Sequence, residues 1–286
     1  MIDLHTHTTF SDGSRTPTQV VEEAAALGLS AVAITDHDTV DGLEEALEAG
    51  ERLGIEVVPG IEINLEHDRV TMDMLGYFLA GMPTEELQVE LAELREYRTE
   101  RNRRMLERLA EIGLPLDESA LEAAAENGAV GRPHIGEAMM RRGYVSSISE
   151  AFEVYLRRGA PAWVDRRRLA LGHALKLLRA SGALPVLAHP GIIRADPAGL
   201  NRIVRDAARD GMAGIECYYP LHDEETVARC LGMARKYALV PTGGSDYHGT
   251  VKPKARLGVG SGGDPVPDRV LTDLRCVAVD QLQRLS

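Results

Sequence analysis

Two histidines near the start of the chain, His5 and His7, lie one residue apart in an apolar segment, and Asp12 follows in a Gly/Ser turn. Successive side chains of a strand point to opposite faces, so residues i and i+2 share a face. Two imidazoles on one face can bind one metal ion. An isolated His-X-His pair is equally consistent with a structural role, so this interpretation needs support elsewhere in the chain.

The support comes from four other apolar segments, AVAIT, IEVVPGI, ALPVLA and ALVPT, each followed by histidine or a carboxylate. The residues in question are Asp36, His37, Asp38, Glu62, His189, Asp246 and His248. Strand carboxyl ends meet at one rim of a β/α barrel, so we expect these groups to converge. Grouping carboxylates and imidazoles without a cation costs many kcal/mol. The sequence therefore predicts a metal site.

Nitrogen and oxygen ligands without cysteine favour Mn²⁺, Zn²⁺ or Fe²⁺ over a structural zinc ion. Carboxylates that can bridge indicate two or three ions, and ions roughly 3.5–4 Å apart are used to cleave phosphate esters. We interpret the remaining histidines as surface or structural groups; they are His67, His173 and His222.

The elements that must position these groups alternate between strand and helix, which predicts an α/β fold with a parallel sheet. The expected strands are 2–5, 30–35, 55–61, 70–78, 183–188, 213–218 and 238–242. In the first helix, Thr16 and Gln19 fit a capping box, Pro17 fits the first turn and Gly28 fits the end. About seven strand–helix units predict a (β/α)7 barrel.

Residues 83–160 break this alternation, because they contain helical patterns only. Thr84 fits a helix N-cap, and Gly113 fits the end of the same long helix. We expect an all-helical insertion domain between two parts of the barrel, 1–82 and 161–286. The segment is rich in both arginine and glutamate, so many of these charges should pair along helix faces.

The composition excludes several functions. The formal net charge is −12, which disfavours an extended surface for nucleic acid or anionic lipid. No apolar run approaches the ~20 residues of a membrane span. Three scattered cysteines and no visible signal peptide predict a cytoplasmic protein. No obligate protein partner is evident.

Six motifs, HTHTTFSDG, ITDHDT, PGIE, RPH, AHPG and GGSDYH, resemble in order those of the PHP (polymerase and histidinol phosphatase) phosphoesterases. The resemblance covers residues 1 to about 260. It implies a distorted seven-stranded barrel with two or three divalent ions, for which we expect Mn²⁺, with Zn²⁺ or Fe²⁺ as alternatives. The metal ligands it implies are His5, His7, Asp12, His37, Glu62, His134, His189, Asp246 and His248.

The family arrangement implies three ligand groups. The first is His5, His7, Glu62 and Asp246. The second is Asp12, His37 and His248, and the third is His134 and His189 with Glu62 bridging. No side chain is expected to be the nucleophile, since a metal-bridging hydroxide would attack phosphorus. The acid that protonates the leaving group is unassigned.

The helical insertion resembles that of the branch containing nucleoside 3′,5′-bisphosphate phosphatases, so we expect removal of the 3′-phosphate from such nucleotides. One alternative is a 5′-to-3′ exonuclease on short RNA or DNA, and another is a nucleotide-binding module without turnover. Arg132 is the first candidate to bind the phosphate that is not cleaved, unless it pairs with a helix acid. Arg158 is a second candidate.

Several residues near these motifs keep two interpretations. Asp36 and Asp38 either orient His37 or form the strand-to-helix turn. Glu216, at the end of AGIEC, is expected to pair with an arginine. Aromatic residues either line the mouth of the site or pack against the insertion; they are Tyr218, Tyr219 and Tyr247, while Trp163 is expected to pack.

Overall fold

The structure, a computed structural model, describes residues 1–117 and 131–285 and shows an α/β fold around one mixed sheet. The strand order is β1-β2-β3-β4-β6-β7-β8, and β5 pairs with β3. The strands are β1 (Ile2–Asp3), β2 (Ala31–Ile34), β3 (Glu56–His67), β4 (Val70–Tyr77), β5 (Leu169–Ala170), β6 (Leu184–Leu187), β7 (Gly214–Tyr218) and β8 (Val240–Gly243). Each predicted strand overlaps one of them, whereas β5 was not predicted.

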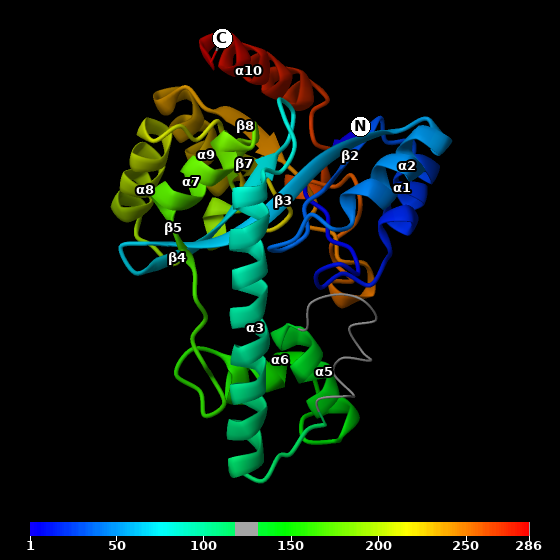
Figure 1. The fold of residues 1–286 in the computed structure, drawn as a ribbon, viewed down its shortest axis with the longest axis vertical. Helices are drawn as coiled ribbons and strands as arrows, with labels where there is room; N and C mark the ends of the chain where they lie inside the picture. The colour runs from blue at the N-terminus through cyan, green and yellow to red at the C-terminus, as the bar shows by residue number, and fades with distance from the viewer. Residues whose placement is uncertain (118–130, 286) are drawn as a thin grey trace.

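Helices pack on the sheet in Figure 1. They are α1 (Pro17–Ala26), α2 (Leu43–Leu53), α7 (Leu171–Ala180), α8 (Pro197–Arg209), α9 (Glu224–Tyr237) and α10 (Arg269–Leu285). The capping box of α1 is confirmed: the Thr16 hydroxyl accepts from the Gln19 backbone N–H, and the Gln19 side chain accepts from the Thr16 N–H. Short 3₁₀ turns follow β6 and β8 at Pro190–Ile192, Gly249–Val251 and Ser261–Gly263.

The prediction of a parallel sheet is wrong in one part. β3 and β4 form an antiparallel hairpin, and β4 also pairs antiparallel with β6. Only Asp68 and Arg69 connect the hairpin, with φ angles of 49° and 66°. Such a two-residue turn matches the twist of an antiparallel pair, whereas a parallel crossover needs a dozen or more residues.

The predicted barrel is not confirmed as a closed sheet, because β1 and β8 share no ladder among the described residues. The segments that continue these strands do approach each other. Thr6 and Tyr247 form a single parallel bridge, and the His7 N–H donates to the Tyr247 carbonyl at 2.8 Å. This bridge places the first motif, which contains His5 and His7, next to the last motif, which contains Asp246 and His248.

Alternating residues of the strands enter two cores. Val32 and Ile34 of β2 belong to the larger core, which lies under α1, α2, α7, α8 and α9. Ala31 and Ala33 face the other core, which α10 covers with Val270 and neighbouring residues. Apolar burial on both faces of β2 explains its continuous apolar sequence.

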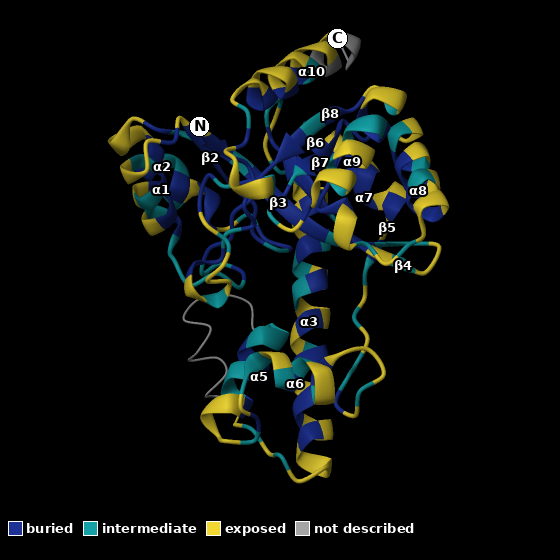
Figure 2. Cartoon of the chain, turned by 180° about the vertical axis from the view of Figure 1, so that it is seen from behind, coloured by how far each residue is buried: buried dark blue, intermediate teal, exposed yellow. Residues whose placement is uncertain are grey.

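The segment expected to be an insertion contains α3 (Glu85–Glu111), α5 (Arg132–Arg141), α6 (Ile148–Ala151) and a π-helical turn at Phe152–Leu156. Thr84 caps α3, as expected. Figures 1 and 2 show α3 extending away from the sheet, with α5 and α6 beside its far half. Residues 118–130 of the expected insertion lie outside the described residues. The division into domains stays a prediction.

Candidate metal centre

Eight of the nine predicted metal ligands come together: Glu62 lies within β3, and the other seven lie in the segments that follow β1, β2, β6 and β8. They form three groups whose ligand atoms lie within 4.8 Å of one another. The groups are His7, Asp12, His37 and His248; His5, Glu62 and His189; and His5, His7 and Asp246. These groups differ from the expected ligand sets in two ways. His7 also belongs to the group that contains Asp12, and His5 belongs to the group that contains His189.

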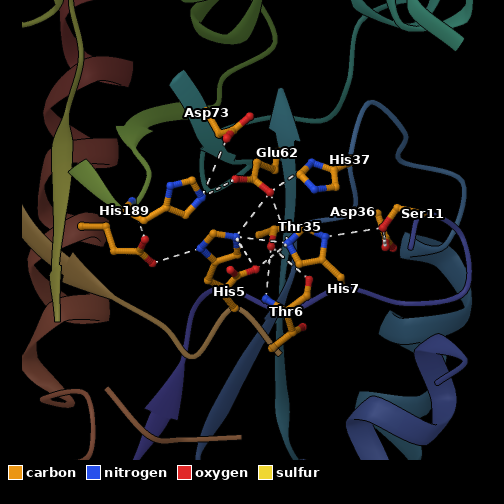
Figure 3. A network of polar contacts seen from close by, with 12 residues as sticks. His5, Thr6, His7, Ser11, Thr35, Asp36, His37, Glu62, Asp73 and His189 are labelled. Carbon is orange, nitrogen blue, oxygen red and sulfur yellow. Dashed lines mark hydrogen bonds and ion pairs between the residues drawn. The ribbon is translucent and has the colours of Figure 1, made fainter. Parts of the chain in front are cut away.

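The Glu62 carboxylate lies at the middle of the cluster (Figure 3). Its Oε2 atom is 3.4 Å from His5 Nε2, 3.2 Å from His7 Nε2 and 3.1 Å from His37 Nδ1, and its Oε1 atom is 3.1 Å from His189 Nε2. Glu62 is 1% exposed. One buried carboxylate therefore contacts imidazoles of more than one group, which fits the bridging role expected of Glu62.

The electrostatics of this cluster follow from burial and charge. Burial alone would raise the pKa of Glu62, but the imidazoles of His37 and His5 outweigh it, and the pKa lies well below its usual range. Burial opposes protonation of His7, yet Asp246 and Glu62 raise its pKa to about 9. The carboxylates thus attract positive charge, whether protons or metal ions.

Four buried atoms of predicted ligands have no hydrogen bond of good geometry within the described structure. They are Asp12 Oδ1, His37 Nδ1, His189 Nδ1 and His248 Nε2. His248 Nε2 and Asp12 Oδ1 approach each other to 3.1 Å without that geometry, as do His37 Nδ1 and Glu62 Oε2 at the same distance. Buried polar atoms are rarely left unsatisfied. Nitrogen and oxygen atoms free in this way, next to carboxylates, fit divalent metal ions.

Asp246 is held from two sides. Its Oδ2 atom accepts hydrogen bonds from the Tyr219 hydroxyl at 3.0 Å and from Lys252 Nζ at 2.8 Å. Its Oδ1 atom faces His7 Nε2 at 3.4 Å and His5 Nε2 at 3.7 Å. One oxygen is therefore occupied by donors, and the other is directed at the cluster.

The backbone around the site adopts conformations that most residues avoid. His189 has φ 29° and Asp246 has φ 53°. A left-handed conformation costs a non-glycine residue roughly 1–2 kcal/mol, and such strain is concentrated at functional sites. Gly244 packs against the first strand, since a Cβ atom there would lie 2.4 Å from the His5 Cβ. This glycine lets β8 approach β1.

Glu216 corrects the sequence-based expectation, because it pairs with no arginine of the described residues. Its Oε1 atom lies 3.0 Å from His5 Nδ1, and its Oε2 atom accepts the backbone N–H of His189 at 2.7 Å. Glu216 is fully buried in the middle of β7. A signal was present in the sequence, since Glu216 is a carboxylate close to the end of an apolar segment, as several predicted ligands are.

Asp36 and Asp38 hold loops and make no hydrogen bond to His37 within the described structure. Asp36 accepts from the Thr8 N–H and hydroxyl, both at 2.7 Å, and from the Ser11 hydroxyl at 2.5 Å. These bonds hold the loop that carries Asp12. Asp38 pairs instead with Arg98.

His134 is the one predicted ligand outside the three groups. It lies in the first turn of α5, is 7% exposed, and its Nδ1 atom accepts the Gly131 N–H at 2.9 Å. Burial lowers its pKa, and the Asp12 carboxylate opposes this shift. The Nδ1 contact leaves Nε2 as the nitrogen available to a ligand.

The predicted phosphate-binding arginines lie in the helical segment. Arg132 stacks over the Phe152 ring at 5.5 Å and donates to the Leu156 carbonyl at 3.4 Å. It forms no ion pair with a carboxylate of the described residues. The alternative expectation, a salt bridge between Arg132 and an acidic residue of a helix, is therefore not observed among them. Arg158 is exposed and stacks over Trp163 at 5.8 Å.

The structure distinguishes between the two interpretations of the tyrosine residues. Tyr219 contacts the site through Asp246, whereas the Tyr247 hydroxyl donates to Glu23 of α1 and Tyr218 packs against both cores. The remaining histidines belong to none of the three ligand groups. His67 faces Asp206, His173 faces Glu90, and His222 accepts from Gly191 and contacts the Cys217 carbonyl.

The cluster on this mixed α/β sheet has the ligand types of a metal centre, and comparison with known proteins assigns the family of the chain. The PHP domain family matches residues 3–155, and the chain belongs to it. It is a family of metal-dependent phosphoesterases, so the resemblance stated from the motifs is confirmed. Within the described residues, no helix has the length and apolar character needed to cross a membrane.

Three curated relatives align with 86% of this chain. A phosphoribosyl 1,2-cyclic phosphate 1,2-diphosphodiesterase of Eggerthella lenta is 36% identical, with 94% of its length covered. A 3′,5′-nucleoside bisphosphate phosphatase of Chromobacterium violaceum is 32% identical, with 87% covered. A 5′-3′ exoribonuclease of Escherichia coli is 33% identical, with 84% covered.

Two solved structures share the fold over nearly the whole chain. A protein of Bifidobacterium adolescentis described as a metal-dependent phosphoesterase has a TM-score of 0.85 and 31% identity, covering 96% of this chain and 95% of its own. A protein of Chromobacterium violaceum described as an amidohydrolase, with bound sulfate and no metal, has a TM-score of 0.82 and 30% identity. The alignment with it covers 91% of this chain and 90% of that one.

Proposed function

We propose that this protein is a metal-dependent phosphatase that removes the 3′-phosphate from nucleoside 3′,5′-bisphosphates, such as 3′,5′-adenosine bisphosphate, in the cytoplasm. The observation that carries the proposal is the convergence of seven other predicted ligands around Glu62, with four buried atoms lacking hydrogen bonds. The relative from Chromobacterium violaceum supports the choice of substrate.

The same proposal assigns the nine predicted ligands to two or three divalent ions, with Mn²⁺ as the native metal. His134 completes the set from α5 in this assignment, although it lies outside the three groups. Divalent ions in such a site supply Lewis-acid stabilisation of phosphoryl oxygens and make a water molecule available as a nucleophile near neutral pH.

The protein's own residues have three tasks in this reaction. Glu62 and the imidazoles around it hold a compact, water-poor centre, in which electrostatic interactions are strong. Lys252 and Tyr219 hold Asp246 so that Oδ1 faces the cluster. Arg132 binds the phosphate that stays on the nucleotide, and Arg158 is the second candidate for this contact.

Two relatives favour other phosphoesters as substrates, and both would use the same centre. The relative from Eggerthella lenta cleaves a cyclic phosphate by its name, and the one from Escherichia coli is an exoribonuclease. The net charge of −12 favours a small ligand over a long strand, because strand binding relies on an extended basic surface. The bisphosphate therefore stays the first choice.

The test compares three substrates with Mn²⁺-loaded protein: 3′,5′-adenosine bisphosphate, a 5′-phosphorylated oligoribonucleotide and a ribose 1,2-cyclic phosphate. We expect the bisphosphate to give 5′-AMP and phosphate with the highest kcat/KM. Asp246→Asn should lower this value more than about 100-fold, since it removes a metal-facing carboxylate. Asp264→Asn, an exposed acid, is the control. Preferred cleavage of either other substrate would contradict the proposal.

A further inference from the structure

Four arginines from separate parts of the chain line one small cavity next to the metal centre. Arg101 comes from α3, Arg132 begins α5, and Arg166 and Arg168 lie just before β5. The cavity has a volume of about 100 Å³, and its lining is completed by Asn64, Thr71, Trp163 and Val164. We call this cavity the arginine pocket.

The positive charges of the arginine pocket are not balanced by the described carboxylates. Arg168 pairs with Asp165 at 2.7 Å and lies 4.0 Å from Glu66, and Arg166 lies 3.9 Å from Asp38, which already pairs with Arg98. Arg101 and Arg132 have no carboxylate within 4.0 Å among the described residues. Arg101 is 7% exposed, and it donates from Nη2 to the side-chain carbonyl of Asn102 at 2.6 Å.

Burial makes this surplus of charge costly. Burial and four neighbouring guanidinium groups, with Arg166 and Arg132 foremost, lower the pKa of Arg101 to about 8. In addition, the Nε atom of Arg168 is buried without a hydrogen-bond partner in the described structure. A bound anion would remove these costs together.

A short chain of contacts joins the arginine pocket to the metal centre. Arg166 Nε donates to Asn64 Oδ1 at 3.0 Å, and Asn64 Nδ2 donates to Asp73 Oδ1 at 2.6 Å. Asp73 Oδ2 lies 3.9 Å from His189 Nε2, and Figure 3 shows these two side chains facing each other. Asn64 is also two residues beyond Glu62 on β3. The pocket and the centre are therefore neighbouring compartments.

We propose that the arginine pocket binds a second phosphate group of the substrate while the metal centre holds the phosphate that is cleaved. This inference rests on the proposed function and extends it, because it assigns Arg101, Arg166 and Arg168 alongside Arg132. One guanidinium group can bind two oxygens of a phosphate through two parallel N–H···O hydrogen bonds. A cavity of about 100 Å³ has room for one phosphate group.

The inference also defines the substrate class. Preferred substrates carry two phosphates separated by a short spacer, which has to reach from His189 past Asn64 to Arg166. Substrates with one phosphate react at the metal centre but leave the arginine pocket without its anion. The difference between the two classes should appear mainly in KM, because the second phosphate binds equally before and during the reaction.

The kinetic test uses Arg101→Met with Mn²⁺-loaded protein, with Arg104→Met as the matched control. Arg104 is on the same helix but is exposed and pairs with Glu100. We expect Arg101→Met to raise KM for 3′,5′-adenosine bisphosphate about 10- to 100-fold, with kcat and the hydrolysis of p-nitrophenyl phosphate within threefold of the parent. Equal losses on both substrates, or no loss on either, would overturn the inference.

A binding test separates this inference from the proposed function. In an Asp246→Asn background, which impairs the metal centre, inorganic phosphate should still raise the melting temperature. Adding Arg101→Met should abolish that shift, as should Arg168→Met, which serves if the first variant does not fold. An unchanged phosphate shift in these double variants would refute the arginine pocket even if no substrate were hydrolysed.

The stability of Arg101→Met distinguishes an anion site from a structural contact. An arginine that only holds α3 against the neighbouring segments would lower the melting temperature when it is removed. A buried charge kept for ligand binding costs stability, so its removal should leave the melting temperature unchanged or raise it by a few degrees. A large decrease in both Arg101→Met and Arg168→Met would count against the inference.

Discussion

Single side chains behind the predicted ligands determine how those ligands point. The carboxylate of Glu216 contacts His5 Nδ1, which leaves His5 Nε2 to face Glu62 and Asp246. Carboxylate partners of this kind set the tautomer and orientation of a metal-binding imidazole. Since Glu216 also accepts the His189 N–H, one side chain orders two of the predicted ligands.

Replacing Glu216 with glutamine should therefore weaken metal binding without removing a ligand. The amide keeps one acceptor, but its NH₂ group cannot accept from a donor, so one of the two contacts is lost. We expect the affinity for Mn²⁺ to fall about 10- to 100-fold, measured by calorimetry. Glu225→Gln, an exposed acid on α9, should bind Mn²⁺ as the parent does. Equal affinities in both variants would contradict a positioning role.

For single residues, the sequence identified the candidate metal ligands more completely than the residues that orient them. His5 and His37 are recognisable because they follow short apolar strands, and Glu62 because it follows the apolar run IEVVPGI, although β3 itself continues to His67. Glu216 has a similar signature, but a carboxylate close to the end of an apolar segment does not alone tell a ligand from the partner of a ligand. That distinction depends on which imidazole it meets across the sheet, which is a tertiary contact.

The β3–β4 hairpin is the element that departs most from the predicted parallel sheet. It pairs over eight residue positions, from Gly60–Tyr77 to His67–Val70, and it carries Glu62, Asn64 and Asp73. The hairpin thus supplies the central carboxylate and the link to the arginine pocket. Its turn contains two non-glycine residues with positive φ angles, Asp68 and Arg69.

Relieving this turn should stabilise the protein. Arg69 has a φ angle of 66°, where glycine is favoured and a side chain costs roughly 1 kcal/mol. We expect Arg69→Gly to raise the free energy of unfolding by up to about 1 kcal/mol in urea denaturation. Arg229→Gly, in the middle of α9, should instead lower it by about 1 kcal/mol. A loss of stability in Arg69→Gly would show that the turn is not strained.

The hairpin also shows why the element prediction was incomplete. Apolar runs locate β3 and β4, and the capping residues locate α1 and α3. The pairing direction depends on the length of the connection, and the two residues between His67 and Val70 are too few for a helical crossover. That length was present in the sequence, whereas the pairing of β4 with β6 depends on contacts across more than a hundred residues.

Across the whole molecule, α3 connects two separate apolar clusters. Leu87, Leu91 and Leu94 of its first half belong to the large core next to the sheet. Met105 and Leu109 of its second half pack with Ile135 and residues of α6. The periodicity of the sequence predicted the helical segment. It could not show that the two halves of one helix would pack in two different apolar clusters. The arginine pocket lies along the same helix, at Arg101.

These two clusters lead to a prediction about stability at the scale of the molecule. Leu109 and Leu91 are both fully buried on α3, and truncating either one should cost about 2–5 kcal/mol. We expect Leu109→Ala to accelerate amide hydrogen exchange in α5 and α6 while β6 and β7 stay protected. Leu91→Ala, the matched control, should accelerate exchange in the sheet as well, because its cluster includes Leu187 of β6 and Ile215 of β7.

The comparison also decides whether residues 83–160 behave as a domain. If Leu109→Ala accelerated exchange in β6 as strongly as in α5, the two clusters would unfold as one unit and the predicted insertion domain would be wrong. If exchange stays local, the helical segment can loosen while the metal centre stays folded. Leu109→Ala should then impair bisphosphate hydrolysis more than p-nitrophenyl phosphate hydrolysis, because Arg101 and Arg132 belong to the loosened part and Glu62 does not.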